Sequence, residues 1–366
     1  MLRTVLWCVS VTTWTTALLA GCTSSGGASA APPLVTDGPV RAIALAADGT
    51  IYIGGGFTHV GATTGSMLPR NHLAAIDSTG VLTSWDPNAD NSVNALAVSG
   101  TTVYVGGDFT KVAGQARAFI AAVDSTGAAT AWNPNANGSV RALAVSGTTV
   151  YAGGDFTGIG GQARNSIAAL DPTGAATSWN PDASSSVLAL AVSGGTVYAG
   201  GTFNRIGGQN RNGVAALDTT GTATAWNPDA PLGAVAALTV SGSTVYAGGN
   251  FRNIGGQART NLAALDSTGA ATPWNPGAGG AVSSPRVSAI AVSGSTVYAG
   301  GWFATAGGQS RNNVVALDST GAATAWNPNA NGAVYALAVR EGTIVTGGNF
   351  TIIGCEQLSY FAFLAP

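Results

Sequence analysis

The chain has 366 residues, of which 53 are glycine, 46% are hydrophobic and only 8% are charged. This apolar content excludes a disordered chain, and glycine without a three-residue period excludes collagen. A net charge of −2 gives no basic surface for a phosphate backbone, so we expect no nucleic-acid partner.

Residues 1–21 have the pattern of a signal peptide. Arg3 precedes a mostly apolar run, VLWCVSVTTWTTALLA, which is too short and too rich in Thr for a transmembrane helix. The run closes on Leu-Ala-Gly-Cys at positions 19–22, which resembles the bacterial lipobox. This resemblance implies that Cys22 is acylated and becomes the mature N-terminus. An ordinary secretory signal that ends by chance near a cysteine is the alternative.

Residues 22–33 are predicted to be the lipidated cysteine and a flexible tether, because Ser, Gly and Ala dominate them. We therefore expect an extracytoplasmic monomer, lipid-anchored in the outer membrane or at the surface of a bacterium. Cys8 leaves with the signal, so Cys355 is the one thiol left in the folded part. We interpret it as a small buried hydrophobic residue, with no disulfide within the domain.

From Val40 onward the chain is an internal repeat of about 47 residues. A Gly-Gly-x-Phe motif marks each copy, and a Trp followed by Asn or Asp and Pro marks the first six. The phenylalanines are Phe57, Phe109, Phe156, Phe203, Phe251, Phe303 and Phe350, and the tryptophans are Trp85, Trp132, Trp179, Trp226, Trp274 and Trp326. We number the seven copies in this order.

Each of the first six copies contains four short strand-like runs, which in copy 3 are VRALAV, TVYAGG, SIAALD and ATSW. No run reaches the length of a helix, and four antiparallel strands at this period are typical of a propeller blade. We predict an all-β fold over residues 34–366, a seven-bladed β-propeller of four-stranded antiparallel blades. Copy 7 ends after three runs. We expect residues 34–36 to add its fourth strand and close the ring, with a three-stranded last blade as the alternative.

Two family resemblances follow from these segments. The segment YAGGDFTGIGGQARNSIAALDPTG, residues 151–174, resembles the bacterial delta-60 propeller repeat, a family of unknown biochemical function. The segment VALDSTGAATAW, residues 315–326, is similar to the tryptophan-docking motif of quinoprotein propellers. The second resemblance implies that Trp docks between blades, and it implies no cofactor.

Two charged residues occur once in each of six copies, so we interpret them as structural. The Asp that ends the third run precedes a turn with Gly, where its carboxylate can accept backbone N–H groups. The Arg that opens the third run is expected to pair internally or cap carbonyl groups, with a cationic ring for an anionic ligand as the alternative. They are Asp77, Asp124, Asp171, Asp218, Asp266 and Asp318, and Arg70, Arg117, Arg164, Arg211, Arg259 and Arg311.

A ligand without sevenfold symmetry needs residues that occur once, so the candidate site lies where the copies differ. The residue after Gly-Gly differs from copy to copy, and the loop between the second and third runs carries further single residues. In an antiparallel blade this loop emerges on the same face as the connectors between blades. The candidate binding residues are Trp302, His59, His72, Lys111, Arg205, Arg252, Asp108 and Asp155. Trp302 is the main candidate, because a large exposed aromatic suits a sugar or a protein partner.

The sequence predicts no catalytic residues and no firm cofactor. His59 and His72 suggest a two-His metal site without a clear third ligand, and Asp108 with Asp155 suggests a calcium site. The leading hypothesis is a non-enzymatic module that binds a protein or a glycan. The alternatives are a glycan hydrolase or lyase, a quinoprotein-like oxidoreductase, and a structural spacer.

Overall fold

The computed structural model describes residues 33–365, which form β-strands and no helix. The all-β prediction is therefore confirmed. The predicted signal peptide and Cys22 lie outside the described residues.

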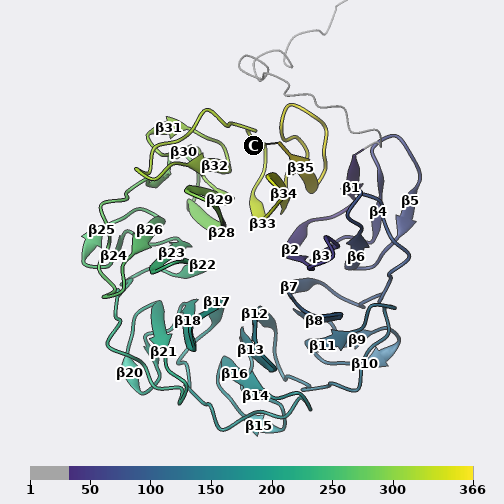
Figure 1. Ribbon diagram of the computed structural model, residues 1–366, viewed down its shortest axis with the longest axis horizontal. Helices are drawn as coiled ribbons and strands as arrows, with labels where there is room; N and C mark the ends of the chain where they lie inside the picture. Colours follow the sequence, from purple (N-terminus) through teal and green to yellow (C-terminus); the bar gives the residue numbers. More distant parts are fainter. Residues whose placement is uncertain (1–32, 366) are drawn as a thin grey trace, which may run out of the picture.

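Seven three-stranded sheets follow one another around a ring (Figure 1). Each copy of the repeat supplies one sheet, whose first strand lies nearest the axis and contacts the first strand of the next sheet. From the axis outward, the strands are β2 (Val40–Leu45), β3 (Ile51–Gly55) and β6 (Leu73–Ile76); β7 (Val93–Ser99), β8 (Thr102–Gly107) and β11 (Ile120–Val123); β12 (Val140–Ser146), β13 (Thr149–Gly154) and β16 (Ile167–Leu170); β17 (Val187–Ser193), β18 (Thr196–Gly201) and β21 (Val214–Leu217); β22 (Val235–Ser241), β23 (Thr244–Gly249) and β26 (Leu262–Leu265); β28 (Arg286–Ser293), β29 (Thr296–Trp302) and β32 (Val314–Leu317); β33 (Val334–Arg340), β34 (Thr343–Gly348) and β35 (Phe361–Leu364).

The fourth run of the repeat makes one β-bridge in place of a full strand. In copy 1 the bridge joins Ile76 to Leu82, and the other bridges of this kind join Val123 to Ala129, Leu170 to Ala176, Leu217 to Ala223, Leu265 to Ala271, and Leu317 to Ala323. The run is short because the chain turns toward the next sheet, where the Trp that follows is anchored.

A second set of short strands lies in the loops between the second and third strands. They form two-stranded hairpins, and a third strand joins them in copies 1 and 6. Their strands are β1 (Leu34–Thr36), β4 (His59–Ala62) and β5 (Met67–Pro69); β9 (Lys111–Val112) and β10 (Gln115–Ala116); β14 (Gly158–Ile159) and β15 (Gln162–Ala163); β19 (Arg205–Ile206) and β20 (Gln209–Asn210); β24 (Asn253–Ile254) and β25 (Gln257–Ala258); β27 (Ala278–Gly279), β30 (Thr305–Ala306) and β31 (Gln309–Ser310). We call this side of the ring the loop face, and the opposite side the turn face.

The N-terminal strand does not complete the last sheet, so that prediction is wrong. β1 pairs antiparallel with β4 of copy 1, because it takes the place that a connector occupies in copy 6, where β27 pairs with β30. It still contacts copy 7. The Thr36 N–H donates to the Ser359 carbonyl at 3.3 Å, and Val35 packs with Phe350 in the same hydrophobic cluster.

Arg340 links the two ends of the ring on the turn face. Copy 7 has no Trp to dock on copy 1. Instead the Arg340 guanidinium donates to the carbonyl of Gly49 at 2.8 Å and to the carbonyl of Ser78. An arginine therefore replaces the tryptophan contact at this one boundary.

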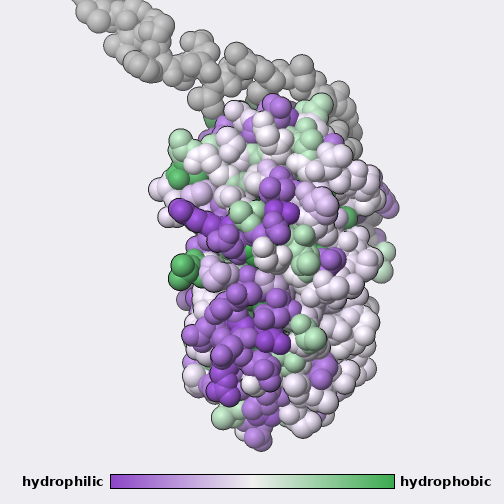
Figure 2. Space-filling view, turned by 90° about the vertical axis from the view of Figure 1, so that its left-hand side faces the viewer, coloured by the Kyte–Doolittle hydropathy of each residue, from purple (hydrophilic) through white to green (hydrophobic). Residues whose placement is uncertain are grey.

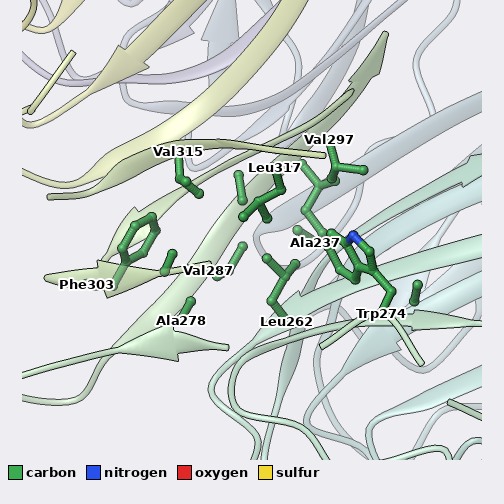
Figure 3. Close-up of a cluster of buried hydrophobic side chains, with 13 residues drawn as sticks. Ala237, Leu262, Trp274, Ala278, Val287, Val297, Phe303, Val315 and Leu317 are labelled. Carbon is green, nitrogen blue, oxygen red and sulfur yellow. The ribbon is translucent and has the colours of Figure 1, made fainter. Parts of the chain in front are cut away.

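Each hydrophobic cluster lies between two neighbouring sheets. Figure 3 shows one of them, in which Leu262 and Trp274 of copy 5 meet Val287 and Phe303 of copy 6. The sheets approach closely because the second strand ends in glycine. A Cβ on Gly153 would lie 2.7 Å from Val187 of the next sheet.

The tryptophans dock between the sheets, as the sequence predicted. The indole N–H of Trp179 donates to the Asp218 carbonyl of the next copy at 2.9 Å, and its ring meets Tyr151 edge to face. The Trp of each of copies 1 to 5 donates the same hydrogen bond to the next copy, at 2.9 to 3.0 Å, and these five side chains are buried. Trp326 is half-buried and donates to the Ala365 carbonyl of copy 7.

Candidate functional site

The repeated aspartates are turn residues, as predicted. In copy 3, Oδ1 of Asp171 accepts the N–H groups of Thr173 and Ala175 and the Thr173 hydroxyl, while Gly174 has a φ of +90°. The hydroxyl bond, followed by the backbone bonds, lowers the pKa of Asp171 below its ordinary value, and the other five behave alike. These carboxylates already have a structural role.

The repeated arginines cap carbonyl groups, which confirms the structural interpretation. The Arg164 guanidinium donates to the carbonyls of Ala163 and Thr177, and each of the other five donates to the carbonyls one residue before it and thirteen residues after it. The guanidinium groups hold the fourth run against the start of the third strand. They form no ring open to a ligand.

The connectors lie on the hairpins, so both belong to the loop face. In copy 2, Oδ1 of Asp90 accepts the N–H groups of Thr110 and Lys111 at 2.7 and 2.9 Å, and Asn137 makes the same contacts in copy 3. Hydrophilic side chains gather along one side of the rim over copies 4 to 6 (Figure 2), and the exposed residues of the hairpins there include Arg205, Gln209 and Asn210.

A β-bulge occurs at the same position in the first strand of every sheet. The strand register shifts between a Val and the Ala two residues later, so the residue between them has no Cα partner on the second strand. Bulges of this kind redirect side chains and are common next to binding sites. The bulged residues, which we call the axial ring, are Arg41, Asn94, Arg141, Leu188, Ala236, Ser288 and Tyr335.

Sequence reasoning missed the axial ring, although the signal was present. The first strands read VRAIAL, VNALAV, VRALAV, VLALAV, VAALTV, VSAIAV and VYALAV, so the second residue differs in most copies while its neighbours hardly change. A position that varies within an otherwise constant strand indicates a side chain that does not serve the shared packing.

Two predicted site residues contact the axial ring directly. Asp108 accepts from Asn94 of its own copy at 3.0 Å and from the hydroxyl of Ser139 in the next copy at 2.6 Å. Asp155 pairs with Arg141 at 2.5 Å and also accepts from a serine hydroxyl of the next copy. The residue after Gly-Gly therefore contacts the axial-ring residue of its own copy and a serine of the next copy in both copy 2 and copy 3.

His59 and His72 contact different groups. The His59 Nδ1 atom lies 3.0 Å from Oδ2 of Asp37 and 2.9 Å from the Thr58 hydroxyl. The His72 Nδ1 atom lies 3.1 Å from the Gly55 carbonyl. Partial burial acts to raise the pKa of Asp37, but hydrogen bonds from Thr58 and His59 outweigh it and lower the pKa to about 2.

Within residues 33–365, no group of three or more His, Cys, Asp or Glu side chains is placed to hold a metal ion. The two-His site therefore gains no third ligand of these types in this part of the chain. The calcium site at Asp108 and Asp155 stays a prediction.

The other predicted residues lie at separate places on the loop face. Lys111 and Arg205 are exposed at the first position of their hairpins, and Arg252 is exposed in the loop of copy 5. Trp302 ends β29, opposite Arg286, and is half-buried. The indole N–H of Trp302 has no hydrogen-bond partner in the described part of the chain.

Cys355 differs from its prediction. It is half-buried and disulfide-bonded, so the interpretation as a buried thiol is wrong. The part of the chain that the structure describes contains no other cysteine. Cys355 has a φ of +69° in the hairpin turn of copy 7, where the equivalent residues in copies 2 to 6 are glycines. Within the described range, no helix is both long and apolar enough to cross a membrane.

Comparison with known proteins supports the β-propeller fold. A family described as "Domain of unknown function (DUF5122) beta-propeller" matches residues 195–223. Virginiamycin B lyase from Staphylococcus aureus aligns over 90% of this chain and 98% of its own, with 15% identity and a TM-score of 0.59. BamB from Moraxella catarrhalis aligns over 87% of this chain and 96% of its own, with 18% identity and a TM-score of 0.50. The WD40 β-propeller domain of Doa1 aligns over 86% of this chain and 92% of its own, with 12% identity and a TM-score of 0.57. No curated protein matches the sequence.

Proposed function

We propose that this chain is a lipid-anchored, extracytoplasmic β-propeller of seven four-stranded blades that binds a protein or a glycan through its loop face. The ring of seven sheets supports the blade count, and the β-bridge in each of the first six copies stands where a fourth strand belongs. A propeller fold suits an interaction module, because its loops vary on a constant scaffold.

One observation carries the binding proposal. The repeated Asp, Arg and Trp side chains all make internal contacts, whereas the candidate residues that occur once lie on the loop face. Trp302 is the strongest of these for a partner, because an aromatic ring with an unbonded N–H offers both a stacking surface and a donor. Arg205, Arg252 and Lys111 add exposed cations on the same face.

Capture from envelope extracts tests this proposal, with the full chain as bait. We expect the Trp302→Ala variant to lose more than about 1 kcal/mol of affinity for the captured partner. The matched control is Asp171→Asn, in a repeated turn of the other face, which should bind normally. Equal binding by both variants, with the fold intact, would contradict the loop-face assignment.

The anchor is tested separately. The Cys22→Ser variant should appear in the soluble extracytoplasmic fraction or fail to mature, because it cannot accept the lipid. Normal maturation with continued membrane association would refute the proposal.

A further inference from the structure

The axial ring contains two arginines at equivalent positions, and their surroundings differ. In copy 3, Asp155 follows Gly-Gly, and its carboxylate binds Arg141 at 2.5 Å. In copy 1, the residue at that place is Gly56, so Arg41 meets no carboxylate there. The same scaffold therefore holds one neutralised cation and one cation without a counter-ion.

Arg41 is available to a ligand. Its side chain is exposed, and it makes no hydrogen bond or ion pair within residues 33–365. The space beside it is open. A Cβ on Gly56 would meet only Ser92 Oγ at 3.6 Å and Pro39 Cδ at 3.8 Å. An anionic group can therefore approach the guanidinium where Asp155 lies in copy 3.

Two aromatic residues precede Arg41 in ring order, one in the neighbouring copy and one in the copy before it. Copy 7 follows copy 6 and contacts copy 1, because β33 lies beside both β28 and β2. Copy 7 contributes Tyr335 to the axial ring, and copy 6 contributes Trp302 opposite the start of β28. Both aromatic residues are half-buried. The order around this arc is therefore indole, phenol and guanidinium.

We infer that this arc binds a uronic acid unit of an acidic glycan, with the carboxylate of the unit on Arg41 and its sugar ring against Tyr335 of the neighbouring copy. A guanidinium binds a carboxylate through two parallel hydrogen bonds, and aromatic rings offer apolar faces to pyranose rings. The other variable positions of copies 6 and 7 are Ser288 and Asn349, whose hydroxyl and amide groups suit sugar hydroxyls better than the apolar side chains of an acidic peptide. The inference rests on the proposed loop-face binding and names its ligand class.

The first test is calorimetric titration of the full chain with oligogalacturonate, with neutral galactose oligomers as the reference ligand. We expect binding of the acidic oligomer only. Arg41→Gln should weaken it about ten- to a hundred-fold, because a charge-assisted pair is lost. Arg141→Gln is the matched control, and it should change the affinity little, because Asp155 already neutralises that arginine.

Two further substitutions give each arginine the neighbour that the other one has. Gly56→Asp should give Arg41 the same partner as Arg141 and abolish binding while Arg41 remains in place. Asp155→Gly should leave Arg141 without its carboxylate and should not weaken binding. Thermal unfolding of each variant reports the fold independently of the ligand.

Three results would overturn the inference: no binding of oligogalacturonate, equal binding of the neutral oligomer, or unchanged affinity in Gly56→Asp. Binding of poly-glutamate as tight as that of oligogalacturonate would also overturn it, because the site would then take acidic peptides. If the inference fails while Trp302→Ala still loses the captured envelope partner, the proposed loop-face function survives. If both fail, the loop face is not the binding surface.

Discussion

The turn face and the loop face of this ring are built from the same seven copies, yet they differ in how far the copies agree. On the turn face, Asp, Thr and Gly recur in six copies and make the same hydrogen bonds. On the loop face, equivalent positions carry residues as different as Gly56, Asp155 and Trp302. Uniform residues serve packing and turns, so the varied face is where selection for a ligand can act.

The largest expected effect comes from breaking a uniform contact. Trp179→Ala removes a buried ring, its hydrogen bond to the Asp218 carbonyl and its contact with Tyr151. We expect a loss of about 3 to 5 kcal/mol in the free energy of unfolding, measured by chemical denaturation. A neutral result would mean that the indole is not part of the sheet-to-sheet packing.

The boundary between copies 7 and 1 differs from the others on the turn face, because Arg340 makes the contact that a Trp makes elsewhere. A substitution of Arg340 tests the importance of this contact. Arg340→Ala removes both carbonyl contacts across this boundary, and we expect a loss of about 2 kcal/mol. Arg340→Lys should recover part of it. Hydrogen exchange should rise first in β2 and β33 if the ring opens at this boundary, and a uniform rise around the ring would argue against this role.

The carboxylates predict how stability depends on pH. Hydrogen bonds in the folded state lower the pKa values of the six turn aspartates and bring that of Asp37 to about 2. A lowered pKa contributes stability above the unfolded value, near 4, and this contribution is lost as the pH falls through the folded value. The unfolding temperature should therefore hold steady above about pH 5 and fall between about pH 4 and pH 2. A constant value over that lower range would contradict these hydrogen bonds.

The smallest effect concerns Leu232, in the connector between Trp226 and β22. Leu232 is fully exposed and has a φ of +59°, a backbone conformation that disfavours a branched side chain. Leu232→Gly should relieve this strain and leave stability unchanged or raise it by up to about 1 kcal/mol, measured by denaturant titration. A clear loss of stability would show that the side chain makes a contact that its exposure does not reveal.

The shared architecture was readable from the sequence, because each structural residue appears about seven times. Trp179, Asp171 and Arg164 were assigned correctly on that ground alone. Structural features that occur in only one copy were harder to predict. The pairing of residues 34–36 depends on which strand edge is free in the folded ring.

The axial ring was missed for a different reason. Arg41 and Arg141 occupy the second position of their strands, where a regular strand would point them toward a neighbouring sheet. The variation at this position is visible in the sequence, but the bulge that removes it from the strand pairing is visible only in the structure. The contact between Arg141 and Asp155 spans two positions that the sequence did not connect.

Hydrogen exchange with and without the captured partner is the most direct test of the claim that binding lies where the copies differ. The account predicts slower exchange at residues 56–59 and 302–305 on the loop face, and unchanged exchange in the turns at 171–174 and 218–221. Protection confined to those repeated turns would contradict it and place the partner on the uniform face.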